Sequence, residues 1–128
     1  MSLKEYFAEK KGFGVLSTAD DKGKVDAAAY AKPYFIDENK VAFIMADKLS
    51  HANLSKNPNA VYLFREDTDG YEGKRVYLKK ESETQDKEAV EVACKIGWPG
   101  PYCAERFLEG HFLVYFTVEE VLPLVVSD

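Results

Sequence analysis

VAFIMADKLSHANLSKNPNAVYL, residues 41–63, predicts a strand, a short helix and a second strand. The run VAFIM is short, apolar and rich in β-branched and aromatic side chains, which is typical of a buried strand. Asp47 is a suitable N-cap for a helix whose first turn would contain Lys48, Ser50 and His51. Pro58 ends that helix, because the residue before a proline is driven out of the helical region.

The first turn of this helix has the composition of an anion site. Its unpaired backbone N–H groups, the positive end of the helix dipole, the Lys48 ammonium and the Ser50 hydroxyl together favour a phosphate group. Spacing alone does not separate this interpretation from two ordinary surface residues beside a cap, since almost every helix start offers similar groups.

The composition predicts one globular domain over residues 1–128, with 46% hydrophobic and 30% charged residues. A net charge of -5 and a pI near 5.1 argue against non-specific nucleic-acid binding, which requires a basic face. No apolar run approaches the roughly 20 residues that span a bilayer. The N-terminal stretch MSLKEYFAEKKG lacks the features of a signal peptide. We therefore expect a cytoplasmic protein that binds neither membrane nor nucleic acid.

The whole chain predicts six strands and three short helices. The strands are expected over residues 14–19, 25–36, 41–45, 60–64, 74–83 and 110–118, and the helices over residues 2–11, 48–57 and 86–95. Short loops and the lack of a repeating strand–helix pattern favour a small antiparallel barrel with helices over its openings. The last strand is apolar enough to be enclosed on both faces. The glycine-rich nucleotide motifs GxGxxG and GxxxxGK[ST] are absent.

The centre of the second strand is rich in alanine, with the sequence DAAAYAKP at residues 26–33. Alanine favours helix by propensity, but the hairpin loop before this segment and the apolar residues 34–36 after it favour a strand. Small side chains on a strand allow something large to lie against the backbone. That neighbour is either a packed helix or a flat ligand.

The cysteines and histidines do not predict a metal site. Cys94 and Cys103 stand nine positions apart, and His51 and His111 are the only histidines, so no zinc set is expected. A reducing compartment disfavours a disulfide between the two cysteines. Both are expected to be buried or half-buried thiols.

The segments GVLSTADDKG, KVDAAAYAKPYF, VAFIMADKLSHANLSKNPNAVYLF and FLVYFTVEEV occur in this order. Together they resemble the pyridoxamine 5'-phosphate oxidase-like family of FMN-binding split barrels. The most specific piece is the NLxxNP pattern at residues 53–58; residues 70–108 are weakly covered. The resemblance implies a mainly β fold, a six-stranded antiparallel split β-barrel. It also implies a homodimer that binds FMN in two clefts between its subunits.

The resemblance also implies which residues hold the cofactor. The phosphate is expected to contact the turn formed by Lys48, Leu49, Ser50 and His51. The isoalloxazine ring is expected to lie over the backbone of Ala28, Ala29, Tyr30, Ala31 and Lys32. Family members often carry a second basic residue in the phosphate turn, where this chain has Leu49, and Arg75 is a candidate replacement. Trp98, in the loop at residues 98–102, is expected to cover the ring or to contribute to a partner surface.

The function implied is that of an FMN-dependent oxidoreductase with an unknown small substrate or electron donor. No side chain is assigned as catalytic; His51 and Tyr30 qualify only by residue type. The pyridoxamine phosphate oxidases end in a substrate-binding Arg-x-His segment, whereas this chain ends VLPLVVSD, so we do not expect it to oxidise pyridoxamine phosphate. The alternatives are a non-catalytic binder of FMN, deazaflavin or haem, with a histidine as the haem ligand, and a cofactor-free barrel dimer.

Overall fold

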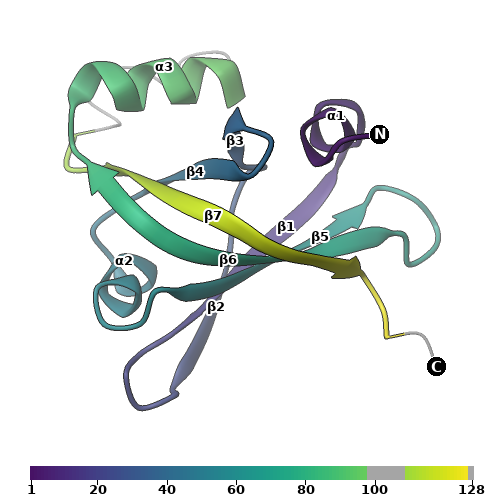
Figure 1. The fold of residues 1–128 in the computed structure, drawn as a ribbon, viewed down its shortest axis with the longest axis horizontal. Helices are drawn as coiled ribbons and strands as arrows, with labels where there is room; N and C mark the ends of the chain where they lie inside the picture. Colours follow the sequence, from purple (N-terminus) through teal and green to yellow (C-terminus); the bar gives the residue numbers. More distant parts are fainter. Residues whose placement is uncertain (98–108, 127–128) are drawn as a thin grey trace.

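The computed structural model describes residues 1–97 and 109–126, which form three helices and seven strands (Figure 1). In chain order these are α1 (Leu3–Glu9), β1 (Gly12–Ala19), β2 (Val25–Ala29), β3 (Tyr34–Asp37), β4 (Lys40–Met45), α2 (Leu49–Leu54), β5 (Asn59–Glu66), β6 (Gly73–Thr84), α3 (Lys87–Gly97) and β7 (Phe112–Pro123). The three helices lie in the regions that the sequence predicted.

The strands form one antiparallel sheet in the order β2-β1-β5-β6-β7-β4-β3. The sheet curls around a single core in which side chains from all the central strands meet, including Leu16, Phe43, Tyr62, Phe64 and Phe116. β2 and β3 follow one another in sequence but occupy the two ends of the sheet. The barrel is therefore split between these two strands, which confirms the predicted antiparallel split barrel.

The predicted number of strands was wrong, because residues 25–36 do not form one strand. The chain leaves the sheet at residues 30–33, between β2 and β3. Pro33 has no N–H group to donate to a neighbouring strand. Lys32 is engaged elsewhere, since its Nζ donates to the carbonyls of Phe7 and Lys10, at 2.8 and 2.9 Å, at the C-terminal end of α1. This break produces the seventh strand and the split.

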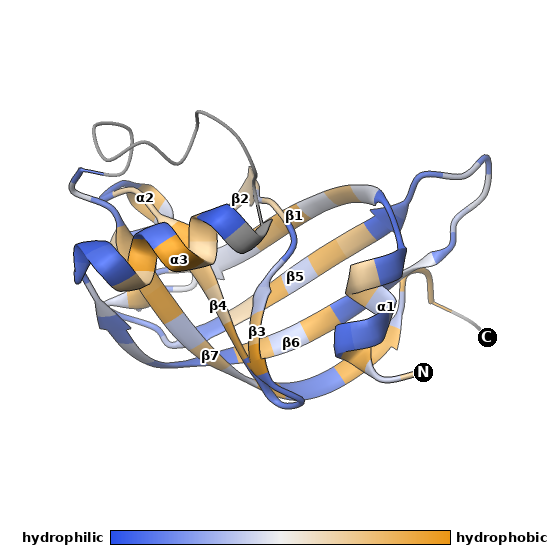
Figure 2. Cartoon of the chain, turned by 90° about the horizontal axis from the view of Figure 1, so that it is seen from above, coloured by the Kyte–Doolittle hydropathy of each residue, from blue (hydrophilic) through white to orange (hydrophobic). Residues whose placement is uncertain are grey.

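Two helices close the barrel and the third covers its outside. Tyr6 and Phe7 of α1 and Leu54 of α2 belong to the central core. Val90 and Ala93 of α3 pack instead outside the barrel, against Ala42 of β4 and Leu113 of β7. Figure 2 shows the apolar stripe of α3 facing the strands, and apolar and polar residues alternating along β5 and β6. That alternation is what one buried face of a strand requires.

The last strand is enclosed on both faces only in its first half. Leu113 faces the α3 cluster, whereas Val114 and Phe116 belong to the central core. From Glu119 to Val121 the strand is exposed. The double enclosure predicted for residues 110–118 is thus confirmed at Leu113 and Val114, where α3 covers the sheet, and the strand continues beyond the predicted end as an exposed segment.

The outside of β2, β1, β5 and β6 carries exposed apolar residues beside half-buried ones. Strand register aligns Ala29, Val15, Leu63 and Arg75 across the four strands. The next row consists of Ala27, Ser17, Val61 and Tyr77. Phe13, one further step along β1, is 62% exposed. We call the surface formed by these nine residues the outer face.

Cys94 is buried and disulfide-bonded, so the prediction of a free thiol at this position was wrong. Cys103 lies outside the described residues. Within residues 1–97 and 109–126, no helix is long and apolar enough to cross a bilayer.

Candidate functional site

The turn before α2 is built differently from the sequence prediction. Lys48, not Asp47, occupies the N-cap position, and its side chain makes no capping hydrogen bond. The first intrahelical bond runs from the Ala52 N–H to the Lys48 carbonyl, at 3.0 Å. The Asp47 carboxylate turns toward His51 four residues later, a pairing that the helix geometry allows. Lys48 is left exposed at the N-terminal end of the helix.

Ser50 connects this turn to the alanine-rich strand. Its side chain is buried and hydrogen-bonded to the Tyr30 phenol. Burial raises the pKa of Tyr30, the Ser50 hydrogen bond partly offsets that rise, and the Asp26 carboxylate adds to it. The phenol is therefore protonated at neutral pH. The structure thus brings together the two segments that the resemblance assigned to one site.

Tyr30 is fixed from both sides. Its N–H donates to the Gly14 carbonyl at 3.1 Å, and its own carbonyl accepts a hydrogen bond from the buried Tyr62 hydroxyl at 3.0 Å. Its ring meets the Phe43 ring edge to face, with centroids 6.0 Å apart. Tyr30 therefore links the core of the barrel to the turn at Lys48.

The alanines of β2 separate onto two faces. Ala27 and Ala29 are exposed on the outer face, whereas Ala28 is half-buried opposite Leu16 of β1. Because β2 is a terminal strand of the sheet, its edge away from β1 pairs with no other strand in the described part of the chain. An edge strand with small side chains permits close approach of another molecule to its backbone.

Two basic residues predicted to contact the cofactor are engaged elsewhere. Lys32 is held at the C-terminal end of α1, as described above. Arg75 lies on β6, where its Nε donates to the Pro123 carbonyl at 2.7 Å. Three strand spacings, roughly 14 Å in total, separate Arg75 from Ala29 along their shared row. Trp98 lies outside the described residues.

His51 is surrounded by partners that the sequence analysis missed. Its Nδ1 lies 3.0 Å from Asp47 Oδ1 and its Nε2 lies 2.9 Å from Glu83 Oε2, on β6. Its ring stacks on Phe112 of β7, with centroids 3.9 Å apart. The four-residue spacing of Asp47 and His51 was visible in the sequence. No local pattern linked His51 to Glu83 or Phe112, because these contacts depend on the barrel closing.

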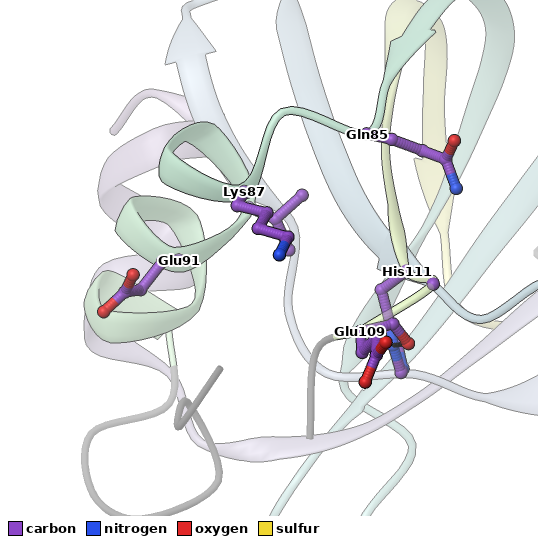
Figure 3. A pocket seen from close by; sticks show the side chains of 7 residues that line it. Gln85, Lys87, Glu91, Glu109 and His111 are labelled. Carbon is purple, nitrogen blue, oxygen red and sulfur yellow. Dashed lines mark hydrogen bonds between the residues drawn. The ribbon is translucent and has the colours of Figure 1, made fainter. Parts of the chain in front are cut away.

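A cavity of about 230 Å³ lies at the corner where β6 leads into α3 and β7 begins. Its polar lining residues are Gln85, Lys87, Glu91, Glu109 and His111, and Val90 and Gly110 complete the lining. Figure 3 shows Lys87 projecting from α3, and Glu109 and His111 next to each other where β7 begins. Glu83 and Phe112, which contact His51, stand within two positions of the lining residues Gln85 and His111 in the sequence.

Comparison with known proteins identifies the fold. No family model matches the sequence, and no curated protein matches it. Solved structures do match. An FMN-binding protein from Syntrophomonas wolfei is 19% identical, with a TM-score of 0.73 over 95% of this chain and 83% of that one. An F420 reductase is 17% identical, with a TM-score of 0.72 over 92% of this chain and 94% of that one.

A pyridoxamine 5'-phosphate oxidase candidate from Lactobacillus delbrueckii is also similar. It is 17% identical, with a TM-score of 0.67 over 95% of this chain and 93% of that one. At such identities the likeness establishes the fold, and function must be argued from the site.

Proposed function

We propose that this chain, which has the fold of the pyridoxamine 5'-phosphate oxidase-like split barrels, is an FMN-binding protein and acts as a flavin-dependent oxidoreductase. One observation carries the proposal: Ser50 and Tyr30 join the exposed lysine at the start of α2 to an edge strand of small residues. A flavin mononucleotide needs both features, a cation for its phosphate and a flat, accessible surface for its ring.

The residues of this chain fit such a ligand. Lys48 is exposed and supplies a positive charge beside the N–H groups of the first helical turn. Ala27 and Ala29 leave room above β2, and the unpaired edge of that strand offers backbone donors and acceptors. Tyr30 keeps its proton at Oη and holds the turn and the strand in one geometry. FMN, when bound, supplies the electron-transfer chemistry, and the protein supplies binding and orientation.

The first test is an absorption spectrum after incubation with FMN and desalting. We expect flavin bands near roughly 375 and 450 nm to remain with the protein. The variant Lys48→Gln should bind FMN about tenfold more weakly, because a charge-assisted contact to the phosphate is lost. Riboflavin, which lacks the phosphate, should bind the variant and the parent protein equally.

Lys56→Gln serves as the matched control, since it removes an exposed lysine at the other end of α2. Equal weakening by Lys48→Gln and Lys56→Gln would contradict a phosphate contact at Lys48. A protein that stays colourless with excess FMN would contradict the proposed function itself.

A deazaflavin is the second candidate cofactor, favoured by the likeness to an F420 reductase over 92% of this chain. The same incubation and desalting with F420 distinguishes a deazaflavin from FMN as the cofactor. Retention of F420 by a protein that releases FMN on desalting would reassign the cofactor while leaving the site unchanged. Haem ligation by His51 is less well supported, because both ring nitrogens of His51 face carboxylates.

We also propose that the outer face binds a second copy of the chain. Its exposed residues are apolar or small, with Phe13, Leu63, Ala27 and Ala29 among them, and they share one surface with the candidate cofactor strand. Exposed apolar patches of this kind mark protein interfaces. Two copies related by a two-fold axis would cover the face symmetrically.

Leu63→Glu should convert a dimer to a monomer. In light scattering at micromolar concentration we expect the parent protein at about twice 14.4 kDa and the variant at about 14.4 kDa. A charge at Leu63 would be buried without a partner in the dimer but solvated in the monomer. Val92→Glu is the matched control, since Val92 is exposed on α3, away from the outer face. A parent protein of 14.4 kDa would contradict the dimer.

A further inference from the structure

We infer that His51 is a positioning residue that fastens the Lys48 turn to β6 and thereby sets the affinity for the phosphate of the cofactor. This inference rests on the proposed function, since it concerns the same site. His51 itself is not expected to touch the phosphate: its role is to hold the backbone and the lysine three residues before it in a binding geometry.

The surroundings of His51 support a structural clamp. Only 12% of its side chain is exposed. Asp47 lies on one side of the ring, at Nδ1, and Glu83 lies on the other, at Nε2. The plane of the ring is tilted by only 18° from that of Phe112. Three separate segments, the loop before α2, β6 and β7, therefore converge on one imidazole.

Hydrogen bonds to both carboxylates require one N–H group at each ring nitrogen of His51. A neutral imidazole donates from one nitrogen and accepts at the other, whereas an ionised carboxylate only accepts. The two carboxylates can therefore both be satisfied only by the imidazolium form. The charged groups facing the ring are Asp47 and Glu83, and Lys80 of β6 pairs with Glu83 in turn. Phe112, from β7, is uncharged.

The clamp should weaken at low pH. Burial tends to raise the pKa of Glu83, but the hydrogen bonds from Lys80 and His51 outweigh it, so the pKa of Glu83 lies below its usual value. A carboxyl whose pKa is lowered in the folded state stabilises the fold at higher pH. That contribution is lost as the pH falls through the pKa of the folded state.

The consequence for the site is preorganisation. The His51 side chain leaves the first turn of α2 and is anchored outside that helix, so it fixes the orientation of the backbone from Lys48 to His51. A turn that is already ordered loses less conformational entropy when it binds an anion. Loosening the clamp should therefore weaken the binding of FMN, which carries the phosphate, and leave the binding of riboflavin unchanged.

The first experiment compares FMN with riboflavin in His51→Gln and Glu83→Gln. We expect each variant to bind FMN about tenfold more weakly and to bind riboflavin within about twofold of the parent protein. The matched controls are His111→Gln, whose Nδ1 lies 3.4 Å from the Glu109 carbonyl oxygen, and Glu81→Gln, an exposed carboxylate on the same strand as Glu83. Equal losses for FMN and riboflavin would overturn the inference.

The pH profile adds a readout that a merely structural role would not change. In the parent protein, the ratio of FMN affinity to riboflavin affinity should fall as the pH is lowered from about 6 to about 3.5, because both Glu83 and the phosphate lose charge. In Glu83→Gln that ratio should fall less, because only the phosphate loses charge over the same range. Parallel profiles in the two proteins would overturn the inference.

A measurement without flavin separates this inference from the proposed function. Amide hydrogen exchange at Ala52 and Ser55, whose N–H groups bond within α2, should quicken about tenfold in His51→Gln and not in His111→Gln. If the parent protein binds no FMN, the proposed function fails, and exchange still reports on the clamp. Unchanged exchange in His51→Gln would overturn the clamp even if FMN binds.

Discussion

Replacement of Phe43 by alanine should lower the free energy of unfolding by about 3–5 kcal/mol, the usual cost of deleting a buried aromatic ring. Phe43 is 3% exposed and lies at the centre of the barrel. Its ring packs against the rings of Tyr62 and Phe116, with centroids 5.1 and 5.7 Å away. The strand that carries Phe43, β4, is paired with β3 and β7 on its two edges.

Urea unfolding followed by circular dichroism, at one fixed protein concentration, measures this loss. Tyr71→Ala is the control, since Tyr71 is 75% exposed in the loop between β5 and β6. We expect that variant to stay within about 0.5 kcal/mol of the parent protein. Comparable losses in the two variants would contradict the position of Phe43 in the core.

Gly14→Ala should cost about 3 kcal/mol, at the upper end of the range for overpacking. A Cβ at this position would lie 1.8 Å from Tyr62 Oη and 2.2 Å from Tyr62 Cζ. Tyr62 cannot swing away, because it is buried against Phe43 and Phe64 and its hydroxyl is bonded to the Tyr30 carbonyl. The same substitution should displace Tyr30 and weaken the binding of FMN.

Gly23→Ala provides the contrast for this prediction. Its Cβ would meet no atom within 4 Å, but its φ of +85° disfavours any residue with a side chain. We expect a cost of about 1 kcal/mol there, caused by the backbone alone. In the Gly14→Ala background, Tyr62→Leu should restore part of the lost stability, and a double-mutant cycle measures that coupling. Strict additivity of the two changes would contradict the predicted clash.

The contacts of Tyr62 connect the stability of the fold to the candidate site. Its ring belongs to the core, and its hydroxyl fixes the residue that hydrogen-bonds Ser50. Substitutions in the core can therefore change ligand binding without touching the ligand. For this reason the control variants Lys56→Gln, His111→Gln and Glu81→Gln leave the core intact.

Much of the fold could be predicted because its causes are local. The strand, helix and strand of residues 41–63 appear as β4, α2 and β5, each within a few residues of the prediction. The alternation of apolar side chains set which face of each strand is buried. The split of the second strand was missed, since Lys32 forms its hydrogen bonds with carbonyls at the C-terminal end of α1 that lie more than 20 positions away in the sequence.

The candidate site was only partly predictable. Lys48 and Ser50 were identified from their position at a helix start, and the alanines from their small size on a strand. The helix cap was assigned to Asp47 instead of Lys48, because capping propensity does not register the competing attraction of His51. Glu83, Lys80 and Phe112 could not be associated with the turn, since they lie about 30 to 60 positions further along the chain.

The sequence by itself determined the class of the fold and the residue types that can hold an anion, because periodicity and turn chemistry act over a few residues. Only the tertiary structure decided which of those residues are free to act. Closure of the barrel directs Lys32 and Arg75 to backbone carbonyls, joins Ser50 to Tyr30 and encloses His51 between two carboxylates. Hydrogen bonds and charges of this kind depend on distance in space, and a linear pattern does not encode that distance.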